Sequence, residues 1–430
     1  MMKKMIISLL LTGFSLGVFA QQNPITDTTL KNLIQLAVTN FPRIKELEEQ
    51  LRVNDVKGEI LQSNYHPTLY GDASYRFAAP APAIPFGGNE IKFQPYNNYA
   101  AGLTLNQLVY DFGKTRMALD KNISEKSLTQ DVIDNNKNSI AYMVAQIYYS
   151  ILFTDKAIKV QLDQLAILHE NERVIQAKLK NGDAIEYDLL TTQVRTSNSD
   201  NLLKELQGNQ EKNFIMMQWL TGSDLKNKIG NGVFEENIPL VTASGSWKTN
   251  NAEARIINRK IEILDYDRQL AMVNNRPNIF ASATGGIRNG IQPEIFKMKL
   301  AGAAGVGLSI PIFSAARPKL QQKLTEVNIE TERLSLNTLE ASINKDLASV
   351  QQDYITIQQK LNNSKFTVEQ AKRAFTLAQT RYKEGLITNV ELILIQTSVE
   401  DANLSVLKYR YQMLLDKLDS HKIIGTKLYQ

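Results

Sequence analysis

The sequence predicts a mainly α-helical protein with some β-structure, in which long coiled-coil helical hairpins adjoin four antiparallel strands and one module occurs twice. Three features of the 430-residue chain indicate this fold. Matching landmarks recur at a constant offset, since Gly182 and Gly385 lie 385 − 182 = 203 positions apart. The segment from Lys114 to Lys180 contains neither proline nor glycine. Four short runs alternate between apolar residues and small or polar ones, as half-exposed strands do.

The first 20 residues are typical of a secretory signal peptide. Lys3 and Lys4 form a charged start, residues 5–19 are apolar, and Val18 and Ala20 stand at the −3 and −1 positions of a cleavage site. The apolar run is too short for a membrane span. We therefore expect an exported protein.

The remaining chain divides into two structural repeats. We place the first at residues 21–222 (helix, two strands, long helix, helix) and the second at 248–425. Residues 223–247 between them are rich in glycine, asparagine and serine, which is typical of a connector, and 426–430 form a tail. Two copies indicate a duplicated module rather than a solenoid.

Each repeat is predicted to contain a helix far longer than a globular domain requires. Apolar residues follow two seven-residue registers in the first repeat, and Ile343, Leu347, Ile357 and Leu361 continue the same pattern in the second. Spacings that alternate between four and three residues are typical of a coiled-coil seam. Thr28 to Ser63 predicts a further helix that precedes the strands.

A glycine interrupts the helical period once in each repeat, at Gly182 and at Gly385. Glycine suits the left-handed conformation that ends many helices. A new helix is predicted after each glycine, because Thr388-x-x-Glu391 forms a capping box and Asp183-x-x-Glu186 resembles one. We therefore expect two antiparallel helical hairpins whose tips lie at the glycines.

The strand-like runs have one apolar face and one small or polar face. Ten-residue runs of this kind suit the strands of a transmembrane barrel, although a half-buried strand of a soluble sheet gives the same pattern. Four strands cannot close a barrel, and open sheet edges are not tolerated in lipid, so other copies of the chain would have to complete it. The residues that we assign to the apolar, barrel-strand face are Leu69, Ala73, Tyr75, Phe77, Tyr99, Leu103, Leu105, Ile279, Ala281, Leu300, Val306 and Leu308.

Composition argues against several functional classes. The chain has no cysteine, and its three histidines are far apart, which gives no pattern for a metal site. A net charge of +5 without a basic, aromatic-rich run does not indicate nucleic-acid binding. We find no nucleotide or hydrolase motif. We expect no cofactor, no metal and no enzymatic activity.

Three motifs resemble those of the TolC-type outer-membrane efflux protein family, the outer membrane factors of tripartite efflux and type I secretion systems. "GLTLNQLVYDFGK" and "GVGLSIPIFSAAR" resemble the family's strand-to-helix junctions, and "RYKEGLITNVELILIQ" resembles its helix-tip turn. The resemblance extends from about Thr28 to Gly425. In the first tip, "KNGD" replaces the apolar residue that usually follows the glycine.

The resemblance implies a homotrimer in the outer membrane of a Gram-negative bacterium. Four strands from each chain would form one twelve-stranded transmembrane β-barrel in outer-membrane lipid, and the helices would form an α-barrel across the periplasm. The hairpin tips would dock on a periplasmic adaptor, also called a membrane-fusion protein, which joins an inner-membrane pump of the RND or ABC type. The tunnel would export small molecules or proteins.

The resemblance also assigns roles to individual residues. Acidic residues past the tip narrow the inner end of the tunnel in this family, and Asp188 and Glu391 occupy these positions. A second acid can follow one turn later, but this chain has Leu394 there. An acid in the first turn of a helix also has a purely structural explanation, because it interacts favourably with the helix dipole. The candidate adaptor-docking residues are Gly182, Asp183, Tyr382, Gly385, Leu386 and Ile387.

Two hypotheses remain from the sequence. The first is an oligomeric export channel that is passive in itself. The second is a secreted or periplasmic coiled-coil scaffold without channel activity. Solubility distinguishes them, because a channel requires detergent and a scaffold does not.

Overall fold

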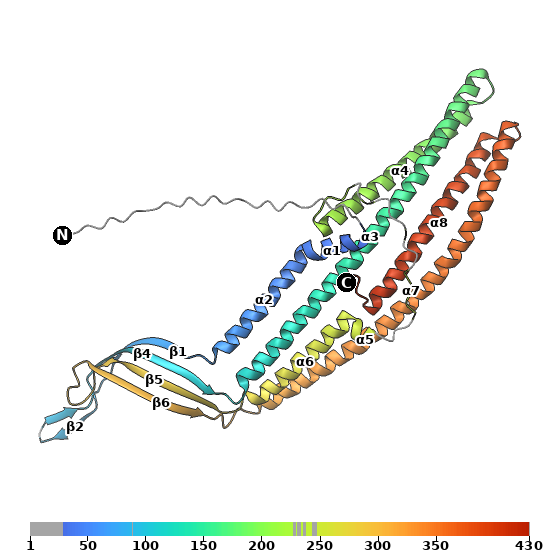
Figure 1. Ribbon diagram of the computed structural model, residues 1–430. Coiled ribbons are helices and arrows are strands. Elements are labelled where there is room, and N and C mark those ends of the chain that lie inside the picture. The colour runs from blue at the N-terminus through green and yellow to red at the C-terminus, as the bar shows by residue number, and fades with distance from the viewer. Residues whose placement is uncertain are drawn as a thin grey trace, which may run out of the picture.

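The computed structural model describes residues 29–87, 89–226, 229, 234, 238–242 and 247–429. The expected signal peptide at 1–20 lies outside the described residues, as does most of the expected connector at 223–247. The molecule is elongated: a sheet lies at one end, and two helical hairpins lead away from it to their tips at the other end (Figure 1).

Helices make up most of the described chain, and two of them are very long. α3 has 68 residues and α7 has 67, so each spans about 100 Å at ~1.5 Å per residue. The helices are α1 (Leu30–Asn40), α2 (Pro42–Ser63), α3 (Lys114–Asn181), α4 (Glu186–Thr221), α5 (Trp247–Asn250), α6 (Ala252–Val273), α7 (Arg317–Lys383) and α8 (Asn389–Ile424).

The two repeats coincide in their element boundaries. α4 and α8 both have 36 residues, and they begin 389 − 186 = 203 positions apart. α3 packs along α4 and α2, while α7 packs along α8 and α6, so two shorter helices accompany each long one. The seven-residue registers are confirmed as the packed seam, because the residues that they predict are largely buried, among them Val144, Ile151, Leu168, Leu347 and Leu361.

The main sheet has four antiparallel strands in the order β1-β4-β5-β6. These are β1 (Thr68–Phe77), β4 (Asn97–Tyr110), β5 (Asn278–Arg288) and β6 (Lys299–Ser309). A small hairpin of β2 (Ala83–Phe86) and β3 (Asn89–Lys92) extends from the end of the sheet that is remote from the helices (Figure 1). The alternation pattern missed this hairpin, since prolines interrupt the run.

Asp111 fixes the junction at which β4 turns into α3. Its carboxylate accepts hydrogen bonds from the backbone N–H groups of Gly113 (3.0 Å) and Thr115 (2.7 Å). Burial alone would raise the pKa of Asp111, but hydrogen bonds from Thr115 and Gly113 lower it below its usual value. The ionised carboxylate therefore satisfies backbone donors at the start of α3.

Two expectations are wrong. The segment from Thr28 to Ser63 is two helices, because Phe41 is extended (φ −63°, ψ 124°) ahead of Pro42, and proline disfavours a helical conformation in the preceding residue. Asp183 and Glu186 do not form a capping box. α4 begins at Glu186 after Ile185, whose side chain cannot accept a hydrogen bond.

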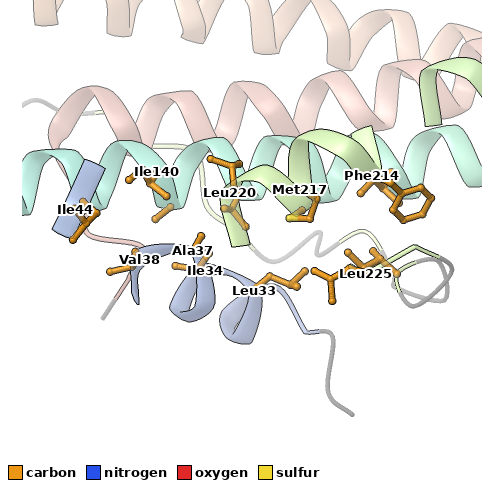
Figure 2. Close-up of a cluster of buried hydrophobic side chains, with 14 residues drawn as sticks. Leu33, Ile34, Ala37, Val38, Ile44, Ile140, Phe214, Met217, Leu220 and Leu225 are labelled. Atoms are coloured by element: carbon orange, nitrogen blue, oxygen red, sulfur yellow. The ribbon is translucent and has the colours of Figure 1, made fainter. Parts of the chain in front are cut away.

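The largest hydrophobic core lies midway along the molecule, where α1 crosses α3 and the end of α4. Leu33, Ile34 and Ala37 of α1 pack against Met217 and Leu220 in this cluster (Figure 2). All five residues are at most 4% exposed. The core holds α1 against the end of α4, beside the point where Phe41 breaks the helix.

Candidate functional site

The two hairpin tips share one backbone geometry. Gly182 and Gly385 have φ values of 82° and 73°, in the left-handed region. The amide of Asp183 donates to the carbonyl of Lys178 at 2.8 Å, and the amide of Leu386 donates to that of Arg381 at 2.9 Å. This bond between the sixth residue and the first defines a Schellman turn, so each glycine ends its long helix.

Apolar side chains are exposed at both tips. Leu386 is 68% exposed and Ile387 is half-buried, while Asp183 is exposed at the equivalent turn of the first hairpin. Ile185 is 63% exposed two positions further along, so the first tip also presents an apolar residue. The motif comparison missed Ile185 because it does not directly follow the glycine, although an isoleucine in a polar turn is itself a signal.

Asn389, the first residue of α8, joins the two hairpins near their tips. It is 3% exposed, and its amide group donates to the hydroxyl of Thr192 at 2.8 Å and to the carbonyl of Asp188 at 3.3 Å. Its side-chain oxygen accepts from Asn171 at 3.1 Å. The sequence does not reveal this residue's role, because all its partners lie about 200 positions away or more.

The candidate tip residue Tyr382 also contacts the first hairpin. The Nζ of Lys178 lies over its ring, 4.7 Å from the centroid, which is a cation–π contact. Burial, together with the negative charge of Asp188, raises the pKa of the Tyr382 hydroxyl. Tyr382 therefore packs at the contact between hairpins, rather than on the outermost surface of the tip.

A buried ion pair lies further along the same contact. Arg195 of α4 and Glu400 of α8 approach to 2.7 Å, and Glu400 is only 3% exposed. Burial raises the pKa of Glu400, although the charge of Arg195 opposes that shift. Beside them, within the first hairpin, the buried Gln161 donates to the carbonyl of Ser199 at 3.0 Å. Polar groups of Arg195, Glu400 and Asn389 therefore contribute to the contact between hairpins in the half of the molecule that bears the tips.

Asp188 and Glu391 are the third residues of their helices, α4 and α8. The Glu391 carboxylate accepts from the amide and hydroxyl of Thr388 at 2.7 and 2.9 Å, and the Thr388 hydroxyl accepts from the Glu391 amide, which confirms the capping box. The backbone hydrogen bond from Thr388 lowers the pKa of Glu391. Glu391 is exposed and Asp188 is half-buried, so both acids lie near the tips. One turn later, Leu394 is 67% exposed.

Strand register places the predicted barrel-strand residues on one face of the main sheet. Leu69 lies opposite Leu105, and Ile279 opposite Leu308. The face is continuous across the two central strands, because Leu105 of β4 also pairs with Ala283 of β5. Large apolar side chains on it are exposed, up to 85% for Leu300. The face therefore needs an apolar environment that the chain does not itself supply.

The described residues contain no group of three or more His, Asp or Glu side chains placed to hold a metal ion. Within the same residues, no helix is both long enough and apolar enough to cross a membrane. The features that remain for a function are thus the two tips, the contact between hairpins and the exposed apolar face of the sheet.

A family model described as "Outer membrane efflux protein" matches residues 33–223 and 261–426. These segments contain 191 + 166 = 357 of the 430 residues. The chain belongs to the outer membrane efflux protein family. Members of this family are channels rather than enzymes, so the expectation of a channel without enzymatic activity is confirmed, and the scaffold alternative is not supported.

Solved structures of outer membrane channels have the same fold. The CmeC outer membrane channel of Campylobacter jejuni matches with a TM-score of 0.75 and 18% identity, over 92% of this chain and 85% of that one. The open-state MtrE channel of Neisseria gonorrhoeae (0.73, 15%, 93% and 90%) and the outer membrane protein VceC of Vibrio cholerae (0.72, 16%, 93% and 97%) are also similar. No curated protein sequence matches the chain.

Proposed function

We propose that three copies of this outer membrane efflux protein assemble into a channel-tunnel that exports cargo delivered by a periplasmic adaptor and an inner-membrane pump of the RND or ABC type. One observation is the main support for the proposed trimer. β1 and β6 are the edges of the main sheet and have no outer partner among the described strands, while the apolar face is exposed. Edges in lipid must be paired, and β1 of one copy pairing with β6 of the next closes a ring.

Helices beside the two edges support the same arrangement. α2 leads into β1 and carries the exposed residues Val53, Val56 and Ile60, while β6 leads into α7, which carries exposed apolar residues such as Leu320 and Leu324. Figure 1 places α2 and α7 on opposite sides of the molecule. Contacts between α2 of one copy and α7 of the next would cover both apolar stripes.

Aromatic pairs support placement of the sheet in lipid. The rings of Tyr75 and Tyr99 lie 5.2 Å apart near the end of the sheet remote from the helices, and those of Tyr110 and Phe112 lie 4.7 Å apart at the helical end. Aromatic residues are enriched at both interfaces of membrane barrels. β1 has 10 residues and β6 has 11, which is the length of a tilted membrane strand.

The tips supply the proposed docking surface, and the acids near them supply the proposed constriction. Leu386, Ile387 and Asp183 would contact the adaptor, while Gly182 and Gly385 set the shape of the turns. In a trimer, Asp188 and Glu391 would contribute three carboxylates each near the inner end. Cargo selection would then depend largely on the pump.

Disulfide trapping tests the assembly, because the chain has no cysteine of its own. Ser74→Cys on β1 is combined in turn with Ala301→Cys, Ala303→Cys and Gly305→Cys on β6. We expect at least one combination to give covalent trimers upon oxidation in outer membranes, and Ser74→Cys alone to give none. A protein that stays monomeric in every combination, and is stable in buffer without detergent, would refute the proposal.

A further inference from the structure

The polar face of the main sheet carries a cluster of cations at its outer end, the end remote from the helices. Arg76 lies near the end of β1, Arg288 at the end of β5 and Lys299 at the start of β6. Alternation along the strands places all three on the face opposite to Leu69 and Leu105. If the apolar face contacts lipid, as the proposed channel requires, this face lines the lumen.

Arg288 and Lys299 are direct cross-strand partners. Like charges directly opposite each other destabilise a sheet, so this pairing has no structural benefit. Glu294 relieves part of the repulsion, because it lies 3.4 Å from Lys299, but it also pairs with Lys297 at 2.5 Å. Within the described part of the chain, neither Arg76 nor Arg288 forms an ion pair, and both side chains are exposed.

The surface beside this cluster is hollow and has a floor of small residues. A groove of about 270 Å³ is lined by residues that include Asp72, Gly102, Gly286 and Arg288. These glycines are cross-strand partners, and a Cβ added to Gly286 would collide with the backbone of Gly102. No side chain covers the floor at this point, which leaves the neighbouring cations accessible.

The polar face carries a net positive charge. Its charged strand residues are three cations and Asp72, which gives 3 − 1 = +2 per chain and +6 in a trimer. Asp188 and Glu391 lie at the other end of the molecule, beyond α3, which is about 100 Å long. That distance is many times the Debye length of ~10 Å at 0.1 M salt, so the two ends act independently.

From this geometry we infer that Arg76, Arg288 and Lys299 form a cationic ring at the outer mouth of the channel that binds multivalent anions entering from outside. The inference rests on the proposed trimeric channel and adds a binding site to it. Rings of basic side chains are how pores attract anions. If Asp188 and Glu391 form the proposed acidic constriction at the other end, current through the open channel should also depend on the direction of the applied voltage.

Planar-bilayer recordings with sodium tripolyphosphate as the probe test this inference. We expect block when the probe is added on the side opposite to the helices, at a much lower concentration than on the helical side, with relief at high salt. The double variant Arg288→Gln/Lys299→Gln should raise the half-blocking concentration by about tenfold, because the ring loses two cations per chain. Arg52→Gln, which removes one exposed arginine on α2 away from the sheet, should leave block unchanged.

The outcomes separate this inference from the proposed function. If the purified wild-type protein forms no conducting channel, both are overturned. If it conducts but tripolyphosphate does not block it from the outer side, only the anion ring is overturned. The ring is also overturned if Arg52→Gln weakens block as much as the double variant does. Calorimetric titration of tripolyphosphate into detergent-solubilised trimers provides a second readout, and equal affinity for wild type and double variant would contradict the ring.

Discussion

The side chain of Asn389 donates a hydrogen bond of 2.8 Å to the hydroxyl of Thr192, and this bond joins the second helical hairpin to the first. Asn389 also bonds to the Asp188 carbonyl and to Asn171, so one buried residue connects α3, α4 and α8. Buried polar groups are costly to leave unpaired, at roughly 1–3 kcal/mol each. The position of the inner tips therefore depends on a few polar contacts.

Asn389→Ala should loosen the tips without unfolding the molecule. The substitution leaves the side-chain amide of Asn171 without its partner, at a cost of roughly 1–3 kcal/mol, while the Asp188 carbonyl keeps its hydrogen bond from the Thr192 hydroxyl. We expect faster amide hydrogen exchange in the first turns of α4 and α8, with exchange in the α1 core unchanged. Asn363→Ala, at an exposed asparagine on α7, is the control. Equal exchange in wild type and Asn389→Ala would show that the contact does not hold the tips.

Asp416 makes stability depend on pH. Burial, together with the charges of Asp353 and Asp419, raises its pKa from 3.8 to about 6. In the pH window between 3.8 and about 6, the Asp416 carboxyl is therefore protonated in the folded state and ionised in the unfolded chain. The contribution of Asp416 to stability is therefore greatest at the acidic end of that window and declines as pH rises from 3.8 through about 6. Gln146 and Lys422, which face Asp419, complete the polar surroundings.

Asp416→Asn should remove this pH dependence, because the amide stays neutral. Thermal unfolding of detergent-solubilised protein should give a higher Tm for the variant than for wild type at about pH 8, and similar values near pH 4. Asp163→Asn, at an exposed aspartate on α3, should leave the pH profile of wild type unchanged. If the Asp416→Asn profile parallels that of wild type, the Asp416 carboxyl is not the group responsible.

Local signals predicted most of the fold, whereas contacts between distant segments were not predictable. Three predictions that depend only on neighbouring residues match the structure: the left-handed conformations of Gly182 and Gly385, and the capping box at Glu391. The sheet faces followed from alternation alone. The break at Phe41 was missed although Pro42 signals it, because the helical pattern resumes beyond it. The roles of Asn389 and of the pair Arg195–Glu400 require knowledge of which helices lie side by side.

Leu386→Asp tests the proposed docking surface. Leu386 is 68% exposed, so it does not serve mainly to close the turn of its own hairpin. A buried carboxylate at an apolar interface is costly, so the variant should lose export while it retains trimers. Dye accumulation in cells that depend on this channel measures export, and Leu386→Met is the conservative control. Full export by Leu386→Asp would exclude a docking role for this residue.

Glu391→Gln tests whether the acids near the tips form a selective constriction or only stabilise helix starts. Glutamine also serves in a capping box, so the variant should keep its helix content while each trimer loses three negative charges. If the carboxylates face a narrow lumen, wild-type channels should prefer cations and be blocked by multivalent cations from the helical side. The Thr388 hydrogen bonds lower the pKa of Glu391, so the preference for cations should persist as pH falls towards 4.5, the ordinary pKa of a glutamate.

Recordings in planar bilayers measure this. We expect Glu391→Gln to reduce both selectivity and block by a few fold. Asp188→Asn should act in the same direction, and more weakly if the ring of Asp188 carboxylates is wider. Should Glu391→Gln change thermal stability yet leave ion selectivity intact, Glu391 is a helix cap and does not line the constriction.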